Sequence, residues 1–462
     1  MTSLNQPPAE RGTQNERTLE VPAAFYTSST ASITNGTTTD LESNIPVKDV
    51  SSDDDIKPEA DVDEPPPDGG WNAWLQALMA HLVIINTWGT INSFGIFQTF
   101  YRGYLSRAAS DISWIGSMQV FFLFVVGVFT GRLTDAGYFR VVFAGGSALV
   151  VIGSLTASFA TGYWQLFLSQ GVCVGLGMGG LFCPVMAVLS TYFKQRRNLA
   201  IGIAISGSAT GGMVYPIMAR QLLPKLGFGW TMRTMALVQF VTLLVANVFM
   251  RARLRPRRAG PLIEISAFKE RPYLLFTIGM FFNFWGVYFA FYYIGPFSRD
   301  ILSFTYDSSI DILMVMNGVG AIGRVLPGFL ADHFLGPLNV VTPAAMVCTV
   351  LLYCWIAVKS APALYTWAVL YGMFGATVQG LFPAALSSLT TDLRKAGTSM
   401  GMVYSIISLA NLSGPPIAGV LIKVGGGRYV YAQLFGGTCL LLGSSFLIAC
   451  RIAKGGCGLA KV

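Results

Sequence analysis

The chain has 462 residues, of which 53% are hydrophobic and only 12% are charged, and its mean hydropathy is +0.55. A soluble globular domain carries about a quarter charged residues. The composition therefore excludes an ordinary water-soluble domain and favours a protein whose main body lies in lipid.

The charges are divided unevenly along the chain. Of the 23 acidic residues, 14 lie in the first 68 positions, whereas 27 of the 31 basic residues follow them. The first 68 residues thus carry −10 (4 bases, 14 acids) and the remainder +18 (27 bases, 9 acids). Because residues 1–67 are also poor in large apolar side chains, we expect a disordered tail there. We place this tail in the cytoplasm, where the sequon at Asn35 stays unused.

From Asp68 onward the chain consists of apolar segments long enough to cross a hydrocarbon core of roughly 30 Å. This pattern predicts an all-α membrane protein with twelve transmembrane helices. The predicted spans are 73–100, 112–131, 141–160, 165–190, 199–223, 231–250, 272–297, 309–330, 338–358, 364–389, 398–422 and 429–450.

The Lys and Arg residues in the short loops predict the orientation. With the N-terminus inside, the loops and tail on the inner side hold 17 basic residues, and the loops and helix ends on the outer side hold 8. Positive residues concentrate on the cytoplasmic side of membrane proteins. Both termini are therefore expected in the cytoplasm, with the chain in the plasma membrane or the vacuolar membrane.

The two halves of the chain repeat each other. Residues 131–135 and 328–332 both read G-x-L-x-D, and 180–184 and 380–383 share Gly-Leu-Phe followed by a proline. Six spans repeated in the same orientation indicate two pseudo-symmetric six-helix bundles, related by an axis along the membrane normal. The predicted parts are a tail (1–67), an N-terminal bundle (68–250), a central cytoplasmic loop (251–270), a C-terminal bundle (271–451) and a cytoplasmic tail (452–462).

The G-x-L-x-D segments are candidate gates. Asp135 and Asp332 could cap a helix N-terminus or pair with a nearby arginine such as Arg132 or Arg140. Such contacts lock one face of a carrier until its bundles move apart. Alternatively, both aspartates are solvated loop acids.

Glycine is frequent, with 51 residues in the chain. Small residues four apart permit close helix contact in lipid. The glycines either pack static helices or provide sliding surfaces for a carrier. They concentrate in the fourth and fifth spans, at Gly171, Gly175, Gly177, Gly179, Gly180, Gly202, Gly207, Gly211 and Gly212.

Arg324 is the most informative single residue, because it lies well inside the eighth span. A guanidinium is costly in lipid and therefore should face a cavity and a partner. Arginine binds carboxylates through two parallel hydrogen bonds, which suits an anionic substrate. Alternatively, Arg324 is structural and is neutralised by a neighbouring helix.

Further candidates for substrate contact are polar and aromatic. The seventh span offers Asn283, Trp285, Tyr288 and Tyr292, and the first span holds His81, which could instead serve packing. No Asp or Glu lies deep within any span. Coupling to protons would therefore depend on His81 or on the substrate's own acid.

Enzymatic activity is not indicated. The chain has no P-loop and no G-x-S-x-G motif, and its two histidines form no zinc-ligand pair. The expected partners are a small organic solute and the lipid bilayer, with no cofactor, no metal and no nucleic acid.

Two longer motifs carry a family resemblance. Residues 68–74 read Asp-Gly-Gly-Trp-Asn-Ala-Trp, similar to D-G-G-W-G-W with one residue inserted, and residues 192–208 look like a fifth-span motif of the same family. In these motifs the chain resembles the monocarboxylate porter family of the major facilitator superfamily, particularly its fungal branch. The resemblance covers roughly 68–450 and implies a secondary carrier.

The resemblance also bears on the substrate. Animal monocarboxylate carriers have an Arg in the eighth span, an Asp one turn before it and a Lys in the first span. Arg324 matches the Arg, whereas the Asp position holds Gly320 and the Lys position falls near Asn92. The resemblance thus adds Asn92 to the candidate substrate contacts and argues against obligatory proton symport of lactate or pyruvate.

These observations predict a transmembrane transporter, secondary-active or facilitative, that works by alternating access on a small organic solute bearing a carboxylate. Fungal relatives include exporters of secondary metabolites and uptake carriers for monocarboxylates or vitamins, and both remain open. A third alternative is a membrane sensor that keeps the carrier fold without transport.

Overall fold

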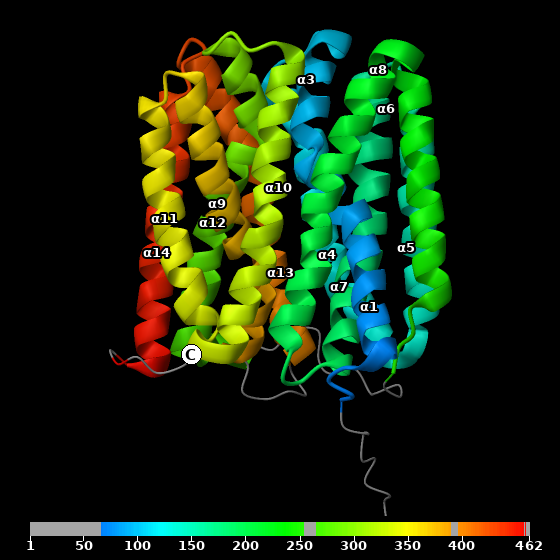
Figure 1. The fold of residues 1–462 in the computed structure, drawn as a ribbon, viewed down its shortest axis with the longest axis vertical. Coiled ribbons are helices and arrows are strands. Elements are labelled where there is room, and N and C mark those ends of the chain that lie inside the picture. The colour runs from blue at the N-terminus through cyan, green and yellow to red at the C-terminus, as the bar shows by residue number, and fades with distance from the viewer. Residues whose placement is uncertain (1–65, 254–264, 390–395, 457, 459–462) are drawn as a thin grey trace, which may run out of the picture. The chain divides into compact units, whose positions relative to one another are not determined.

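Apolar segments of this length form helices because lipid offers no partners to backbone N–H and C=O groups, which a helix satisfies within itself. The computed structural model describes residues 66–253, 265–389, 396–456 and 458, with the backbone alone at 109, 135 and 396–398. The described chain is almost entirely helical (Figure 1). The predicted disordered tail, the sequon at Asn35 and residues 254–264 of the central loop lie outside the described residues.

The N-terminal bundle comprises the elements up to α8. In chain order these are α1 (Gly70–Ile84), the π-helix η1 (Ile85–Gly89), α2 (Thr90–Asn92), α3 (Phe94–Leu105), α4 (Ala109–Leu133), the π-helix η2 (Thr134–Tyr138), α5 (Phe139–Ala157), α6 (Tyr163–Leu166), the π-helix η3 (Phe167–Cys173), α7 (Val174–Tyr192) and α8 (Arg197–Phe249).

The C-terminal bundle comprises the elements from α9 onward, after a short 3-10 helix, η4 (Ile265–Lys269). In chain order these are α9 (Arg271–Asp300), α10 (Tyr306–Leu330), the π-helix η5 (Ala331–Leu335), α11 (Pro337–Cys354), the 3-10 helix η6 (Trp355–Ala357), α12 (Ala361–Leu389), α13 (Ala396–Val424) and α14 (Val430–Gly455). Helix α14 thus continues past the predicted boundary of the bundle at residue 451.

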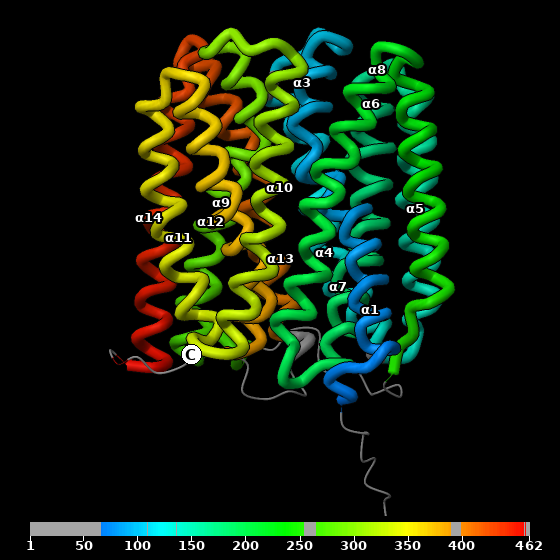
Figure 2. The backbone as a smooth tube through the Cα atoms, in the orientation of Figure 1, coloured from blue at the N-terminus to red at the C-terminus, as the bar shows by residue number. Residues whose placement is uncertain are grey.

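Ten described helices are long and apolar enough to cross a membrane. One of them, α8, has 53 residues and contains a non-helical break at Gly227, so it supplies two crossings. The segment from Gly70 to Leu105 is interrupted by η1 and supplies another. The described helices are therefore consistent with the twelve crossings that the hydropathy pattern predicts. Figure 2 shows α1 beginning and α14 ending at the same end of the helices.

The two G-x-L-x-D segments adopt the same local structure. Each aspartate lies in a π-helical turn, η2 or η5. Each segment also has a glycine with positive φ, a conformation that favours glycine: Gly137 (94°) lies within η2, and Gly336 (81°) directly follows η5. The sequence repeat is therefore also a structural repeat.

The bundles meet along two pairs of helices. Helix α4 packs against α13, and α8 packs against α10, while α3 approaches α9. We call the end at which α1 begins and α14 ends the terminal face, and the end at which α3 and α9 end the distal face. This arrangement places the middle of α10, with Arg324, at the boundary between the bundles.

The glycines of the fourth and fifth spans serve two different contacts. The glycines of the fourth span approach only α4 and α5, which belong to the same bundle. In α8, Gly207 and Gly211 approach the first span, but Gly202 lies against the backbone of Arg324 and Gly212 against Asn317, both in the other bundle. Static packing therefore accounts for most of these glycines, and only Gly202 and Gly212 lie at the boundary between bundles.

Gly323→Ala should destabilise the protein, because a Cβ atom there would lie 2.1 Å from the carbonyl oxygen of Met373 in α12. Overpacking of this kind costs about 1–3 kcal/mol, and here the opposing atom is backbone. We expect a lower melting temperature and lower membrane abundance, measured on fluorescent fusions by thermal denaturation. Gly145→Ala is the matched control, since nothing lies within 4 Å of that position. Equal melting temperatures for both variants would contradict the close packing of α10 on α12.

Candidate functional site

The guanidinium of Arg324 is held at the bundle boundary by neutral groups. The residue is only 2% exposed. Its Nη1 donates to the carbonyl oxygen of Gly320 at 3.0 Å, and its Nη2 donates to Oε1 of Gln379 in α12 at 3.3 Å. Among the residues that the structure describes, no carboxylate pairs with Arg324. The positive charge is therefore buried without an opposite charge.

Two glycines leave room for this side chain. A Cβ atom on Gly320 would lie 2.7 Å from Nη1 of Arg324, and one on Gly380 would lie 3.2 Å from its Cγ. Gly320 and Gly380, which lack side chains, therefore leave the space that the guanidinium and its stem occupy.

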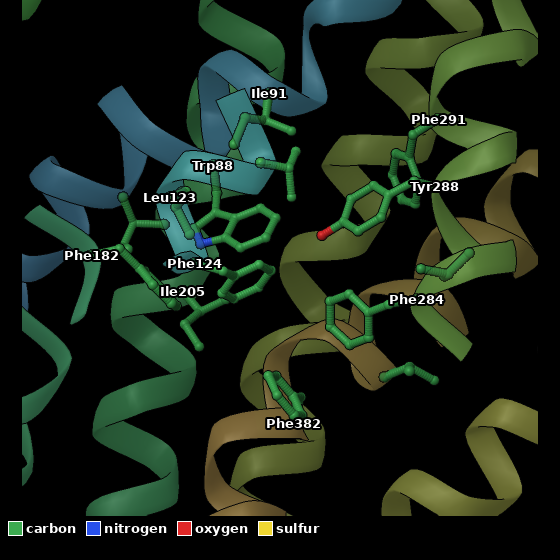
Figure 3. Close-up of a cluster of buried hydrophobic side chains, with 14 of the residues drawn as sticks. Trp88, Ile91, Leu123, Phe124, Phe182, Ile205, Phe284, Tyr288, Phe291 and Phe382 are labelled. Carbon is green, nitrogen blue, oxygen red and sulfur yellow. The ribbon is translucent and has the colours of Figure 1, made fainter. Parts of the chain in front are cut away.

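Arg324 lines a small cavity of about 20 Å³ between the two bundles. A cavity of this size holds about one water molecule, so a solute can enter only when the bundles move apart. Most of the lining is aromatic, with rings from both bundles facing one another (Figure 3). The lining residues are Trp88, Phe124, Phe182, Ile205, Ser208, Phe284, Tyr288, Arg324, Gln379, Phe382 and Pro383.

A second cavity, of about 10 Å³, lies within the N-terminal bundle and not between the bundles. Its polar lining is neutral, and it includes the side chains of Gln119, Gln170 and Gln239. A substrate there would not contact the C-terminal bundle, so relative motion of the bundles would not expose it to either face. The cavity at Arg324 is the better candidate.

Of the predicted substrate contacts, the structure brings Tyr288 and Arg324 together at the cavity. Three other residues of α9 point elsewhere. Asn283 donates to the carbonyl oxygen of Gly279 in its own helix at 2.8 Å and lies against Gly443 of α14. Trp285 packs on Phe435 of α14, and Tyr292 packs on Phe94 of α3.

His81 and Asn92 also lie outside the cavity lining. His81 contacts α8, with Nδ1 at 2.9 Å from the carbonyl oxygen of Ile203 and Nε2 at 3.2 Å from Oγ1 of Thr210. This contact joins two helices of one bundle. Asn92 is 1% exposed, and neither polar atom of its side chain has a hydrogen-bond partner among the described residues.

At the terminal face, Asp332 joins the two bundles. Its carboxylate accepts hydrogen bonds from the backbone N–H of Leu199 at 2.8 Å and of Asn198 at 3.3 Å. These groups belong to the first turn of α8, where N–H groups have no partner within the helix. The aspartate of one bundle therefore caps a helix of the other.

The other gating candidates are placed differently. Arg140 donates to the carbonyl oxygen of Asn247 at 3.3 Å within the N-terminal bundle. Arg132 is half-buried in the last turn of α4. The side chain of Asp135 lies outside the described part of the chain, so its predicted contacts stay a prediction.

At the distal face, ion pairs join the bundles. Arg220 of α8 lies 2.6 Å from Asp311 and 3.2 Å from Asp307 of α10. Arg102 of α3 lies 3.5 Å from Asp300 of α9. None of these five groups was among the gating residues predicted from the sequence. With Asp332 at the other end, both faces of the central cavity are bridged, as expected of an occluded state.

Most of the residues that line the cavity were not predicted from the sequence. Gln379, the partner of Arg324, is the only amide side chain in the tenth span, 364–389, and that isolation was an available signal. Trp88, Phe124, Phe182, Phe284 and Phe382 carried no signal, because aromatic residues occur throughout the spans.

The two family motifs contact each other at the terminal face. The carboxylate of Asp68 accepts hydrogen bonds from the backbone N–H of Lys194 and, at 2.7 Å, of Gln195. The rings of Trp74 and Phe193 pack with centroids 5.0 Å apart. One motif therefore anchors the start of the first span to the loop that precedes α8.

Sequence comparison relates the chain to fungal transporters. An MFS-type transporter of Gibberella zeae is 51% identical over 410 residues, which cover 88% of this chain and 93% of that protein. MFS-type transporter dbaD of Emericella nidulans is 39% identical, covering 77% and 80%. The aspyridones efflux protein apdF of the same species is 34% identical, covering 86% and 82%.

Solved structures and a family model agree with the fold. The human organic anion transporter MFSD10 (TETRAN) superposes with a TM-score of 0.63 at 16% identity, covering 81% of this chain and 98% of that one. A bacterial homolog of the human lysosomal transporter Spinster gives 0.59 at 15% identity, covering 82% and 96%. The family model of the Major Facilitator Superfamily matches residues 79–391. The chain is therefore a membrane transporter that belongs to the Major Facilitator Superfamily.

Proposed function

We propose that this transporter exports a small organic anion by alternating access, with Arg324 binding the anionic group. The observation that carries the proposal is the buried guanidinium, which lines a cavity between the bundles and has only neutral partners among the described residues. A charge in this position is costly unless a ligand pairs with it. A carboxylate or similar oxyanion would provide that pairing through the planar guanidinium.

Alternating access follows from the contacts at the two faces. Opening the terminal face requires Asp332 to leave the first turn of α8. Opening the distal face requires the ion pairs of Arg220 and Arg102 to break. The helices within each bundle can stay packed in either case, because these contacts lie between the bundles and not within them.

The direction of transport rests on orientation and relatives. The distribution of basic residues supports a cytoplasmic terminal face. The protein apdF, which resembles this chain over most of its length, is described as an efflux protein. With this orientation, the likeness to apdF favours export of a fungal secondary metabolite from the cytoplasm.

We also assign the chain to the monocarboxylate porter family. The contact between its two signature motifs, at Asp68 and Gln195, supports this assignment, since each motif then has a structural role. Gly320 and Asn92 stand where animal members carry charges, which favours a substrate other than lactate.

A strain lacking the gene tests function and direction together. We expect an organic acid to accumulate in the cells and to decrease in the medium, as measured by mass spectrometry of both fractions. Reintroducing the wild-type gene should reverse the change, whereas Arg324→Gln at equal membrane abundance should not. Depletion of an acid from the cells would instead indicate an uptake carrier, and unchanged profiles with altered gene expression would indicate a sensor.

A further inference from the structure

Two parallel rings lie on opposite sides of the bundle boundary at the cavity. The rings of Trp88 in η1 and Tyr288 in α9 have centroids 6.0 Å apart and planes inclined by only 13° (Figure 3). Trp88 meets Phe124 and Phe182 edge-on, at 61° and 76°. Among these three contacts, therefore, only the one that crosses to Tyr288 has parallel rings.

This pair must separate during transport, because its two rings belong to different bundles. When they part, each presents a flat apolar face to the widened cavity. A flat conjugated molecule can stack on both faces at once, whereas a saturated molecule of similar volume cannot. Two parallel rings thus favour a planar substrate.

The polar atoms of the cavity indicate which chemical group the other end of the substrate carries. Nε of Arg324, Nε2 of Gln379 and the hydroxyl of Tyr288 are buried and have no hydrogen-bond partner among the described residues. The orientation of the Gln379 amide follows from its partner, since Nη2 of Arg324 can only donate and must meet Oε1. The NH₂ group of Gln379 therefore remains available as a donor.

All three atoms can donate a hydrogen bond, and one belongs to a cation. The hydroxyl of Ser208 does not add to them, because it donates to the carbonyl oxygen of Ile205 at 2.6 Å. Buried donors without partners are costly, so a ligand that binds well must present acceptors. An ionised group with two or more oxygens meets this requirement, and an amine does not.

We propose that the substrate is a flat, conjugated organic acid whose oxyanion is bound by Arg324, Gln379 and Tyr288 and whose planar body is clamped between Trp88 and Tyr288. The proposal rests on the proposed function, of which it specifies the substrate class. It makes Trp88 and Gln379 specificity residues of the carrier.

A pair of probe acids tests the clamp. 2-Naphthoate and decahydro-2-naphthoate carry the same carboxylate on ring systems of similar size, one flat and one puckered. Equilibrium binding to the purified full-length protein should favour 2-naphthoate by about tenfold, as expected for stacking on aromatic rings. Trp88→Leu should reduce this preference to within about twofold, and Trp88→Phe should retain part of it.

Matched variants separate the clamp from the anion site. Trp164→Leu removes an exposed tryptophan of α6 and should keep the full preference. Arg324→Gln should weaken both acids equally. If the wild type binds both acids equally and this binding depends on Arg324, the clamp is wrong but the anion carrier is supported. The same conclusion follows if both Trp88 variants keep the full preference for 2-naphthoate. Binding of neither acid, or binding that does not depend on Arg324, would overturn the proposed function itself.

Discussion

Arg324→Gln should abolish transport while the protein remains folded and abundant in the membrane. Removing one partner of a buried charge pair costs about 2–5 kcal/mol, which corresponds to an affinity roughly 30-fold to several thousand-fold lower. The fold should tolerate the change, because the substitution removes a buried charge that has no carboxylate partner among the described residues. Efflux of the exported acid from loaded proteoliposomes measures the effect.

Arg324→Lys provides the conservative comparison. Lysine keeps the positive charge but lacks the planar fork that binds two oxygens at once, so we expect partial transport. Wild-type efflux by Arg324→Gln would show that the guanidinium does not contact the substrate. Loss of efflux accompanied by loss of the folded protein would instead assign Arg324 a structural role.

Asp332→Ala should weaken closure of the terminal face. Removing a helix N-cap costs about 0.5–2 kcal/mol, and the negative charge near the helix N-terminus adds to this. Here the capped helix α8 and the aspartate belong to different bundles, so the loss opens the boundary and leaves each bundle folded. We expect hydrogen exchange at the amides of Asn198 and Leu199 to accelerate about 3-fold to 30-fold.

Two further variants define the origin of this effect. Asp332→Asn keeps an acceptor oxygen and should show a smaller acceleration. Asp307→Asn weakens an ion pair at the distal face and should not accelerate exchange at Asn198 or Leu199. Unchanged exchange in Asp332→Ala would show that the aspartate is a solvated loop acid, the alternative that the sequence left open.

The helices were predictable because the bilayer imposes one simple rule on the chain. Each span must be apolar and about 20 residues long, so the run from 112 to 131 could be read as a span without knowing its neighbours, and it lies within α4. Helix α8 was also predicted as two spans, although its residues continue from Arg197 to Phe249 with a single break at Gly227.

The candidate site was only partly predictable. Arg324 stood out because a lone charge in an apolar span has few explanations. Trp88 and Gln379 did not, because their roles depend on which face of a helix meets the other bundle. Trp285 and Asn283 illustrate the same limit, since they lie in the same aromatic segment as Tyr288 but pack against α14.

The sequence sufficed to identify a two-bundle carrier. Hydropathy and the lone arginine report the cost that lipid imposes on single segments, and the repeat shows that the segments form two related halves. The composition of the cavity and the contacts that close its ends depend on how the two bundles pack. Asp332 and Leu199 are 133 positions apart along the chain, and no local pattern joins them. Their contact arises from long-range packing, which places side chains of different helices together according to their shapes and not their order in the chain.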